Sequence, residues 1–184
     1  MAGAWGEHVV EVRPVGDVEA VILLDDGRRP VSTLVTPDAT WPVASALRVG
    51  VAVLERLAHR PPDGTLPAIH ADSVWLSKAD EAVALVPTGD DPRYWAPERF
   101  AGRGGDDERI AFYALGVLLF HMLTGQRPFD SATAEELAHA HAARRPPDLR
   151  ALRPEVPAIV ATLVSRLLAK DRAGRYQSRQ GAPG

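Results

Sequence analysis

Few side chains in this sequence have a type and spacing that could support chemistry, and two adjacent carboxylates, Asp90 and Asp91, are the first candidates. Neighbouring carboxylates could bind a cation, but a pair directly before Pro92 is more typical of a solvated turn, so we predict a turn and no metal site. The chain has no cysteine, which excludes disulfides, thiolate ligands and cysteine nucleophiles. It also has no asparagine, and its only lysines are Lys78 and Lys170.

The histidines and one serine offer little more. His139 and His141 are two residues apart on a predicted helix and therefore point to different faces, so they do not form a ligand pair. His121 interrupts an apolar run and is interpreted as a core or boundary histidine rather than a general base, because the sequence suggests no carboxylate or hydroxyl partner near it. Ser73 lacks the histidine and acid arrangement of a nucleophile.

Length and charge narrow the class of protein. A chain of 184 residues suffices for one domain with a hydrophobic core and is short for two. Its 21 basic and 24 acidic residues are interspersed, without the basic stripe that nucleic acid or an anionic membrane requires. No apolar stretch approaches the roughly 20 residues that cross a bilayer. We therefore expect a cytoplasmic protein with neither nucleic-acid nor membrane partners.

The first half of the sequence predicts two small hairpins and a helix. Two β-branched runs within residues 8–24 predict two strands joined by a turn. Apolar residues at helical spacing predict a buried helix over 43–59. Short apolar runs at 73–76 and 82–86 predict a second hairpin.

The second half is predicted to be helical. Residues 109–124 are apolar nearly all round, which indicates a central helix enclosed by others, with Gly125 as its stop signal. A second helix is predicted within 131–145, capped by Ser131, and a third over 157–169, beginning at a proline.

Three segments, taken together, resemble the C-terminal lobe of bacterial serine/threonine protein kinases. "PRYWAPERF" is similar to the family's substrate-side loop, which ends in Ala96-Pro97-Glu98; "YALGVLLFHMLTGQRPF" is similar to the central helix; and "LLAKDRAGRYQS" is similar to the closing helix. The resemblance implies an α+β, protein-kinase-like fold, mainly the α-helical C-lobe with a remnant of the N-lobe β-sheet. It implies a single domain over 1–178, with a truncated N-lobe and hinge at 1–40, a helical C-lobe at 41–178, and a frayed tail at 179–184.

The resemblance fails where the family's chemistry is carried out. Phosphate transfer in the family needs a glycine-rich loop, a strand lysine, a catalytic-loop aspartate, and an asparagine and a second aspartate on magnesium. Aligning "LPAIHADSVWL" with the catalytic loop places Ala68 at the aspartate, His70 at the loop lysine and Ser73 at the asparagine. Pro87-Thr88-Gly89 takes the place of the magnesium motif Asp-Phe-Gly. Alanine and proline side chains can neither accept a proton nor hold a cation.

A rival alignment makes His70-Ala71-Asp72 the catalytic triplet. It places Ser77 at the asparagine and moves the magnesium aspartate to about Asp90. That leaves no room for an activation segment and puts the apolar strand at 73–76 out of register, so the first alignment is preferred.

The family's supporting positions differ in outcome: the one that braces the catalytic loop is lost, and the two that hold the lobe together are kept. The family's central helix begins with an aspartate that braces the catalytic loop, and Ala111 stands in that place. The glutamate of the family's Ala-Pro-Glu motif forms a buried pair with an arginine near the closing helix, and the resemblance assigns these places to Glu98 and Arg175.

These features favour a pseudokinase-like binding or scaffolding module without phosphotransfer and without a cofactor. Two alternatives remain: a divergent serine/threonine kinase that uses ATP and magnesium after completion by another chain, and a decayed fragment without function. The resemblance places an unpaired edge and an apolar face at Val10, Val21 and Ile22, so we expect a protein partner or self-association there. Trp95 is expected to pack and to offer a contact for a bound peptide, and Trp75 to pack.

Overall fold

The protein was analysed as a computed structural model, and no helix among its described residues is both long and apolar enough to cross a membrane. The described residues are 9–15, 18–24, 28–37, 40–58, 66–77, 83–86, 88–103, 105 and 107–177, with only the backbone described in the strands before residue 25. The predicted tail at 179–184 and the position of Pro87 lie outside them.

The N-terminal hairpin confirms the prediction of two strands joined by a turn. Strands β1 (Val9–Val15) and β2 (Val18–Leu24) are antiparallel, and their register shifts twice along the ladder. Among the described residues, each of these strands is hydrogen-bonded only to the other.

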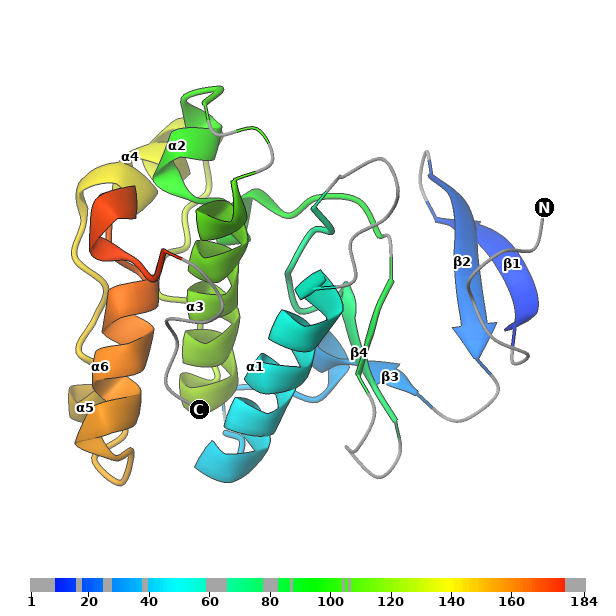
Figure 1. Ribbon diagram of the computed structural model, residues 1–184, viewed down its shortest axis with the longest axis horizontal. Helices are drawn as coiled ribbons and strands as arrows, with labels where there is room; N and C mark the ends of the chain where they lie inside the picture. The colour runs from blue at the N-terminus through cyan, green and yellow to red at the C-terminus, as the bar shows by residue number, and fades with distance from the viewer. Residues whose placement is uncertain are drawn as a thin grey trace.

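A second small sheet lies between this hairpin and the helices (Figure 1). Its strands are β3 (Arg29–Pro30), β4 (Val74–Leu76) and β5 (Val83–Leu85), in the order β3-β4-β5, with both neighbouring pairs antiparallel. The β4–β5 pair confirms the second predicted hairpin. The alternation of a strand directs Val74 and Leu76 inward, and both are buried.

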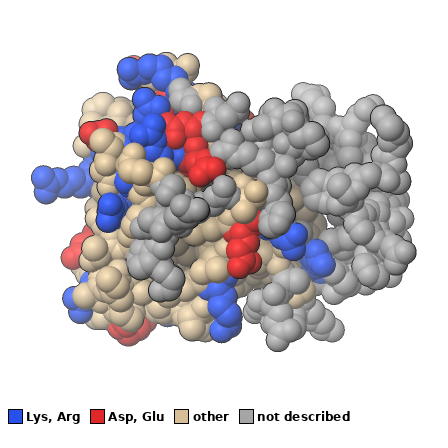
Figure 2. All heavy atoms as spheres, viewed as in Figure 1, with Lys and Arg blue, Asp and Glu red and all other residues tan. Residues whose placement is uncertain are grey.

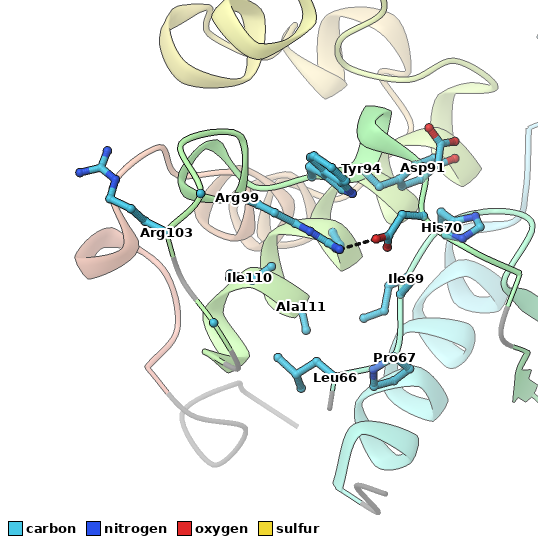
Figure 3. Close-up of a pocket in the computed structure, with 16 residues that line it drawn as sticks. Leu66, Pro67, Ile69, His70, Asp91, Tyr94, Arg99, Arg103, Ile110 and Ala111 are labelled. Atoms are coloured by element: carbon cyan, nitrogen blue, oxygen red, sulfur yellow. Dashed lines mark hydrogen bonds and ion pairs between the residues drawn. The ribbon is translucent and has the colours of Figure 1, made fainter. Parts of the chain in front are cut away.

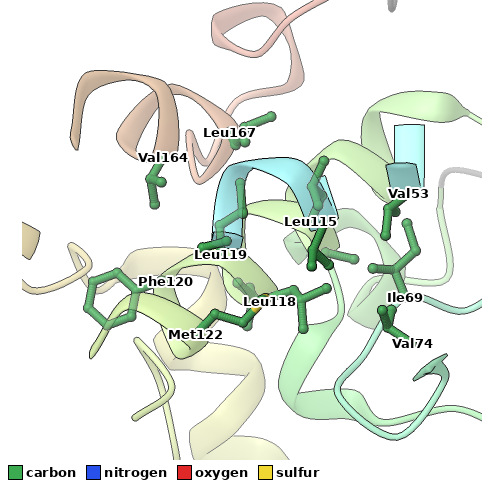
Figure 4. Packing of buried hydrophobic residues seen from close by; sticks show 14 of the residues in the cluster. Val53, Ile69, Val74, Leu115, Leu118, Leu119, Phe120, Met122, Val164 and Leu167 are labelled. Atoms are coloured by element: carbon green, nitrogen blue, oxygen red, sulfur yellow. The ribbon is translucent and has the colours of Figure 1, made fainter. Parts of the chain in front are cut away.

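The central helix α3 (Glu108–Thr124) is enclosed as predicted, and every residue from Ala111 to Thr124 is buried. Helix α1 (Val43–Ala58) and helix α6 (Ala158–Leu167) flank it (Figure 1). Figure 4 shows leucines of α3 meeting Val53 of α1, Val164 and Leu167 of α6, and Val74 of β4 in one apolar cluster. The segment before β4 and the segment before α3 carry the candidate site described below, and this shared core holds both in place.

The ends of α3 follow from local chemistry. Asp107 caps the helix by accepting a hydrogen bond from the Arg109 backbone N–H. Gly125 ends it in the left-handed region at φ 74°, which confirms the predicted stop signal.

The cap predicted for the next helix is wrong. Helix α4 (Ala134–Ala143) is capped by Thr133, whose hydroxyl accepts from the Glu136 backbone N–H, and Ser131 lies before the helix. Serine and threonine are both good caps, so the sequence could not rank them. The third predicted helix is present as α6, with Pro157 as its capping residue.

Several short elements were not predicted. They are the helices α2 (Pro97–Phe100) and α5 (Leu149–Leu152) and the 3-10 turns η1 (Val31–Thr33), η2 (Pro92–Tyr94) and η3 (Arg172–Gly174). The described chain is thus mostly helical with small sheets, an arrangement compatible with the C-lobe of a kinase-like fold.

Candidate functional site

The segment aligned with the family's catalytic loop is closed by its own hydrogen bonds. Ser73 is fully buried, and its hydroxyl accepts from the His70 backbone N–H at 3.0 Å. The same hydroxyl lies 2.8 Å from the Ala68 carbonyl and 3.0 Å from the His70 carbonyl, to which it can donate. The serine therefore ties residues 68–73 into a turn that leads into β4.

The two ring nitrogens of His70 differ in their hydrogen-bond partners. The side chain is buried, with 3% of its surface exposed. Its Nε2 lies 2.9 Å from the Gly89 carbonyl and 3.5 Å from the Thr88 hydroxyl. Among the described residues, its buried Nδ1 has no hydrogen-bond partner, and Oδ2 of Asp72 lies 4.0 Å from it.

The two adjacent carboxylates form a turn, as predicted, but only one of them is solvated. Asp91 caps η2 by accepting from the Arg93 backbone N–H, and both of its oxygens receive bonds from the Arg93 guanidinium at 2.8 Å. Its side chain is 10% exposed, so the expectation of solvent around it is wrong; Arg93 offsets the cost of its burial. Asp90 is 42% exposed and pairs with Arg99.

A cleft of about 360 Å³ lies beside this turn. Figure 3 shows Leu66, Pro67 and Ile69 of the loop on one side and Ile110 and Ala111 of α3 on the other, with Arg99 extending across the opening. Ala68 also lines the cleft. The two alanines that the alignment places at the family's carboxylate positions therefore line the same space.

Two buried histidines each lie within hydrogen-bond distance of a tyrosine hydroxyl. Neither contact was predicted from the sequence. His121 Nδ1 lies 2.8 Å from the Tyr94 hydroxyl, and His141 Nδ1 lies 3.0 Å from the Tyr113 hydroxyl. The core interpretation of His121 is confirmed, but the expectation that it lacks a hydroxyl partner is wrong. His141 is buried and His139 is exposed, which confirms that the two point to different faces.

Burial keeps both of these histidines neutral. Burial and the nearby charges of Arg127 and Arg93 lower the pKa of His121 to about 4. Burial and the charge of Lys170 lower the pKa of His141 to about 4. Burial also raises the pKa of Tyr94 and of Tyr113, so neither tyrosine ionises near neutral pH. At pH 7 each pair is therefore a neutral, buried hydrogen bond between a tyrosine and a histidine.

The ion pair that the resemblance implies between Glu98 and Arg175 is present. Two parallel bonds of 2.7 and 2.9 Å join the guanidinium to the two carboxylate oxygens, and Arg175 is fully buried. The remaining N–H groups of the guanidinium donate to the carbonyls of Arg109, Ala169 and Lys170. The substrate-side loop is thereby anchored to the start of α3 and to the turn after α6.

Trp95 packs against its neighbours, as expected. The Trp95 ring lies 5.3 Å from the ring of Phe100 and 4.5 Å from the guanidinium of Arg99. Within the described part of the chain, its buried indole N–H has no hydrogen-bond partner. The Trp75 indole N–H donates to the Asp72 carbonyl at 2.9 Å.

Charges of both signs are mixed on the described part of the surface. On the face in Figure 2, basic and acidic side chains are interspersed over the described residues. The side chains of Val10, Val21 and Ile22 lie outside the described residues, so the partner surface expected there stays a prediction.

Comparison with known proteins finds kinases. No protein-family model matches the chain. The chain is 36% identical over 89 residues to the serine/threonine-protein kinase PksC of Streptomyces coelicolor, and 43% identical over 88 residues to the serine/threonine-protein kinase Pkn1 of Myxococcus xanthus. It is also 44% identical over 75 residues to the hybrid signal transduction histidine kinase G of Dictyostelium discoideum.

These matches cover 48%, 47% and 41% of the chain, in the order given. Over about half its length the chain is therefore similar to bacterial serine/threonine kinases. The chain spans 16%, 12% and 2% of the lengths of these relatives. The similarity and the helical architecture together support a kinase-like protein.

Proposed function

We propose that this chain acts as a kinase-related binding or scaffolding module that does not transfer phosphate. The similarity to serine/threonine kinases supports the kinase relationship. The proposed absence of phosphate transfer rests on the residues aligned with the family's catalytic positions and on the contacts that these residues make.

The observation that carries the proposal is the hydrogen bonding of Ser73. A magnesium ligand must direct an oxygen into an open site, whereas this hydroxyl is buried and is bonded to the Ala68 carbonyl and the His70 backbone within its own turn. Ala68 and Ala111 line the neighbouring cleft and bring no carboxylate to it. A substrate hydroxyl bound there would meet no catalytic base at either of these positions.

The contacts that hold the lobe together support a folded module. Glu98 and Arg175 are joined by two bonds, and α3 is buried along its length. A lobe that keeps such contacts while its catalytic positions hold alanine and serine is suited to binding rather than to turnover.

Magnesium-ATP provides the test of this proposal. A ligand at 100 times its dissociation constant adds about 2.7 kcal/mol to the free energy of unfolding. We expect no rise in melting temperature with millimolar ATP and magnesium, and no transfer of labelled phosphate to the chain or to a generic protein substrate. A clear rise that Asp72→Ala or Asp90→Ala abolishes would overturn the proposal and favour the divergent kinase.

The first surface proposed for binding is the N-terminal hairpin. Among the described residues, β1 and β2 pair only with each other, so each keeps an outer edge that a strand of a partner or of a second copy could extend. Trp95, beside Arg99 on the substrate-side loop, is proposed as a peptide contact.

Light scattering coupled to size-exclusion chromatography tests self-association through the hairpin. We expect concentration-dependent association that Ile22→Lys weakens. Ile159→Lys is the matched control, because Ile159 is an isoleucine 70% exposed on α6. A chain that stays monomeric at high concentration, or that responds equally to both substitutions, excludes self-association through this hairpin.

A further inference from the structure

Three side chains with metal-binding atoms converge next to the closed turn. One ligand atom from each of His70, Asp72 and Asp91 lies within 4.8 Å of the other two. His70 and Asp72 belong to the turn before β4, and Asp91 belongs to the turn before η2. The cluster therefore joins two segments about 20 residues apart in sequence.

The contact of His70 with Gly89 fixes which ring nitrogen is free. The Gly89 carbonyl can only accept, so the Nε2 atom that lies 2.9 Å from it must carry the proton and donate. In the neutral ring the Nδ1 atom is then unprotonated and presents a lone pair. A metal-binding histidine commonly donates its other ring N–H to a backbone carbonyl in this way, which orients the ring toward the ion.

The free nitrogen of His70 is buried and faces negative charge. Its Nδ1 has no hydrogen-bond partner among the described residues and lies 4.0 Å from Oδ2 of Asp72. A buried lone pair opposite a carboxylate is unsatisfied unless a cation or a proton comes between them. The cluster is also accessible, because His70, Asp72 and Asp91 all line a second cleft, of about 680 Å³.

The two carboxylates differ in how readily they could turn toward an ion. Asp72 is 56% exposed, so its side chain is free to move onto a bound ion. Asp91 is held by Arg93, whose side chain is 41% exposed, so its guanidinium can be displaced toward solvent. The guanidinium therefore competes with a cation for the carboxylate of Asp91.

We propose that His70, Asp72 and Asp91 bind a divalent transition-metal ion, for which Zn²⁺ is the best fit. One imidazole and two carboxylates suit zinc, whereas magnesium and calcium prefer oxygen ligands alone. The site differs from the family's magnesium position, which the alignment places at Ser73 and Pro87. It runs against our expectation from sequence of no metal, and it is independent of the proposed function.

Isothermal titration of the purified chain with Zn²⁺ tests this site. Asp72→Asn removes a ligand from an exposed position and is expected to weaken Zn²⁺ binding at least about tenfold. Asp90→Asn is the matched control, because it removes the same charge from a neighbouring residue outside the cluster and should leave the affinity unchanged. Arg93→Gln frees the carboxylate of Asp91 and should tighten binding, and excess Mg²⁺ should not compete.

Nuclear magnetic resonance of ¹⁵N-labelled histidine gives a second measurement. Zn²⁺ is expected to shift the Nδ1 resonance of His70 while Nε2 stays protonated. No measurable Zn²⁺ binding, an affinity that Asp72→Asn leaves unchanged, or binding that is lost in His139→Gln would each overturn the proposal, the last by assigning the ion to an exposed histidine.

Discussion

Replacing Glu98 by alanine is expected to lower the free energy of unfolding by about 3 to 5 kcal/mol, because it leaves the guanidinium of Arg175 buried without a counter-ion. Arg175 is fully buried, and its partner carboxylate is 8% exposed. Water therefore has little access to either charge. In Glu98→Ala the guanidinium keeps the carbonyl oxygens of Arg109, Ala169 and Lys170 as acceptors, which limits the loss to the ion pair itself.

The reciprocal change is expected to cost more. Arg175→Ala removes the counter-ion of Glu98 and also leaves those three carbonyl groups without their donor. Each buried carbonyl that stays unsatisfied adds about 1 to 3 kcal/mol. Because domains of this size are stable by about 5 to 15 kcal/mol, Arg175→Ala should be close to unfolded at 25 °C. Replacing both partners, as in Glu98→Leu with Arg175→Met, should destabilise less than the sum of the single changes.

Urea unfolding followed by circular dichroism gives the free energies for this comparison. Glu155→Ala is the matched control, since Glu155 pairs with Arg153 at 2.7 Å but is 63% exposed, and its loss should change stability little. Equal midpoint shifts in Glu98→Ala and Glu155→Ala would show that the ion pair of Glu98 with Arg175 does not stabilise the lobe. Strict additivity in the variant that replaces both partners would show the same.

Three further outcomes are expected. The pKa of His141 is about 4 in the folded state, against 6.5 for a free histidine, so the unfolded state binds a proton more readily. The free energy of unfolding should therefore fall as the pH drops from about 6.5 to about 4. His141→Gln should reduce that fall, and His139→Gln, at an exposed histidine, should leave it unchanged. Gly116→Ala would place a Cβ 2.8 Å from the Leu167 Cβ where α3 meets α6, so its unfolding midpoint should drop by the equivalent of about 1 to 3 kcal/mol, and an unchanged midpoint would contradict the packing. Gly125→Ala forces an L-residue to φ 74° with its Cβ against the Thr36 carbonyl oxygen, so the melting temperature should fall, and one equal to wild type would show that this turn is not formed.

The elements that the sequence predicted are those set by local pattern. The apolar run at 109–124 and Gly125 define α3 without reference to the rest of the chain, and β-branched runs define the strands. The ion pair of Glu98 with Arg175 was implied only through the family resemblance, because no local pattern connects residues 77 positions apart.

The features that the sequence did not predict depend on partners distant in the chain. Tyr113 meets His141 only after α3 and α4 have packed, and nothing near His141 signals the contact. Asp91 is buried because Arg93 turns back onto it, whereas its sequence context suggests an exposed turn. The orientation of His70 depends on the Gly89 carbonyl, which reaches it only after the chain has passed through β4 and β5.

Under the proposed function, the buried hydroxyl of Ser73 also bears on how easily phosphate transfer could arise by mutation. Asparagine, the family's residue at the position to which Ser73 was aligned, is larger than serine, and a fully buried side chain leaves little space for it. Ser73→Asn would also remove the hydroxyl that joins the Ala68 carbonyl to the His70 N–H, so the turn would have to open before the amide could fit. The aspartate missing at Ala68 would then be of no use without a rebuilt turn. Each single substitution toward the family's residue is therefore expected to be harmful before any pair of them could help. The proposed non-catalytic form would then be difficult to leave by stepwise change.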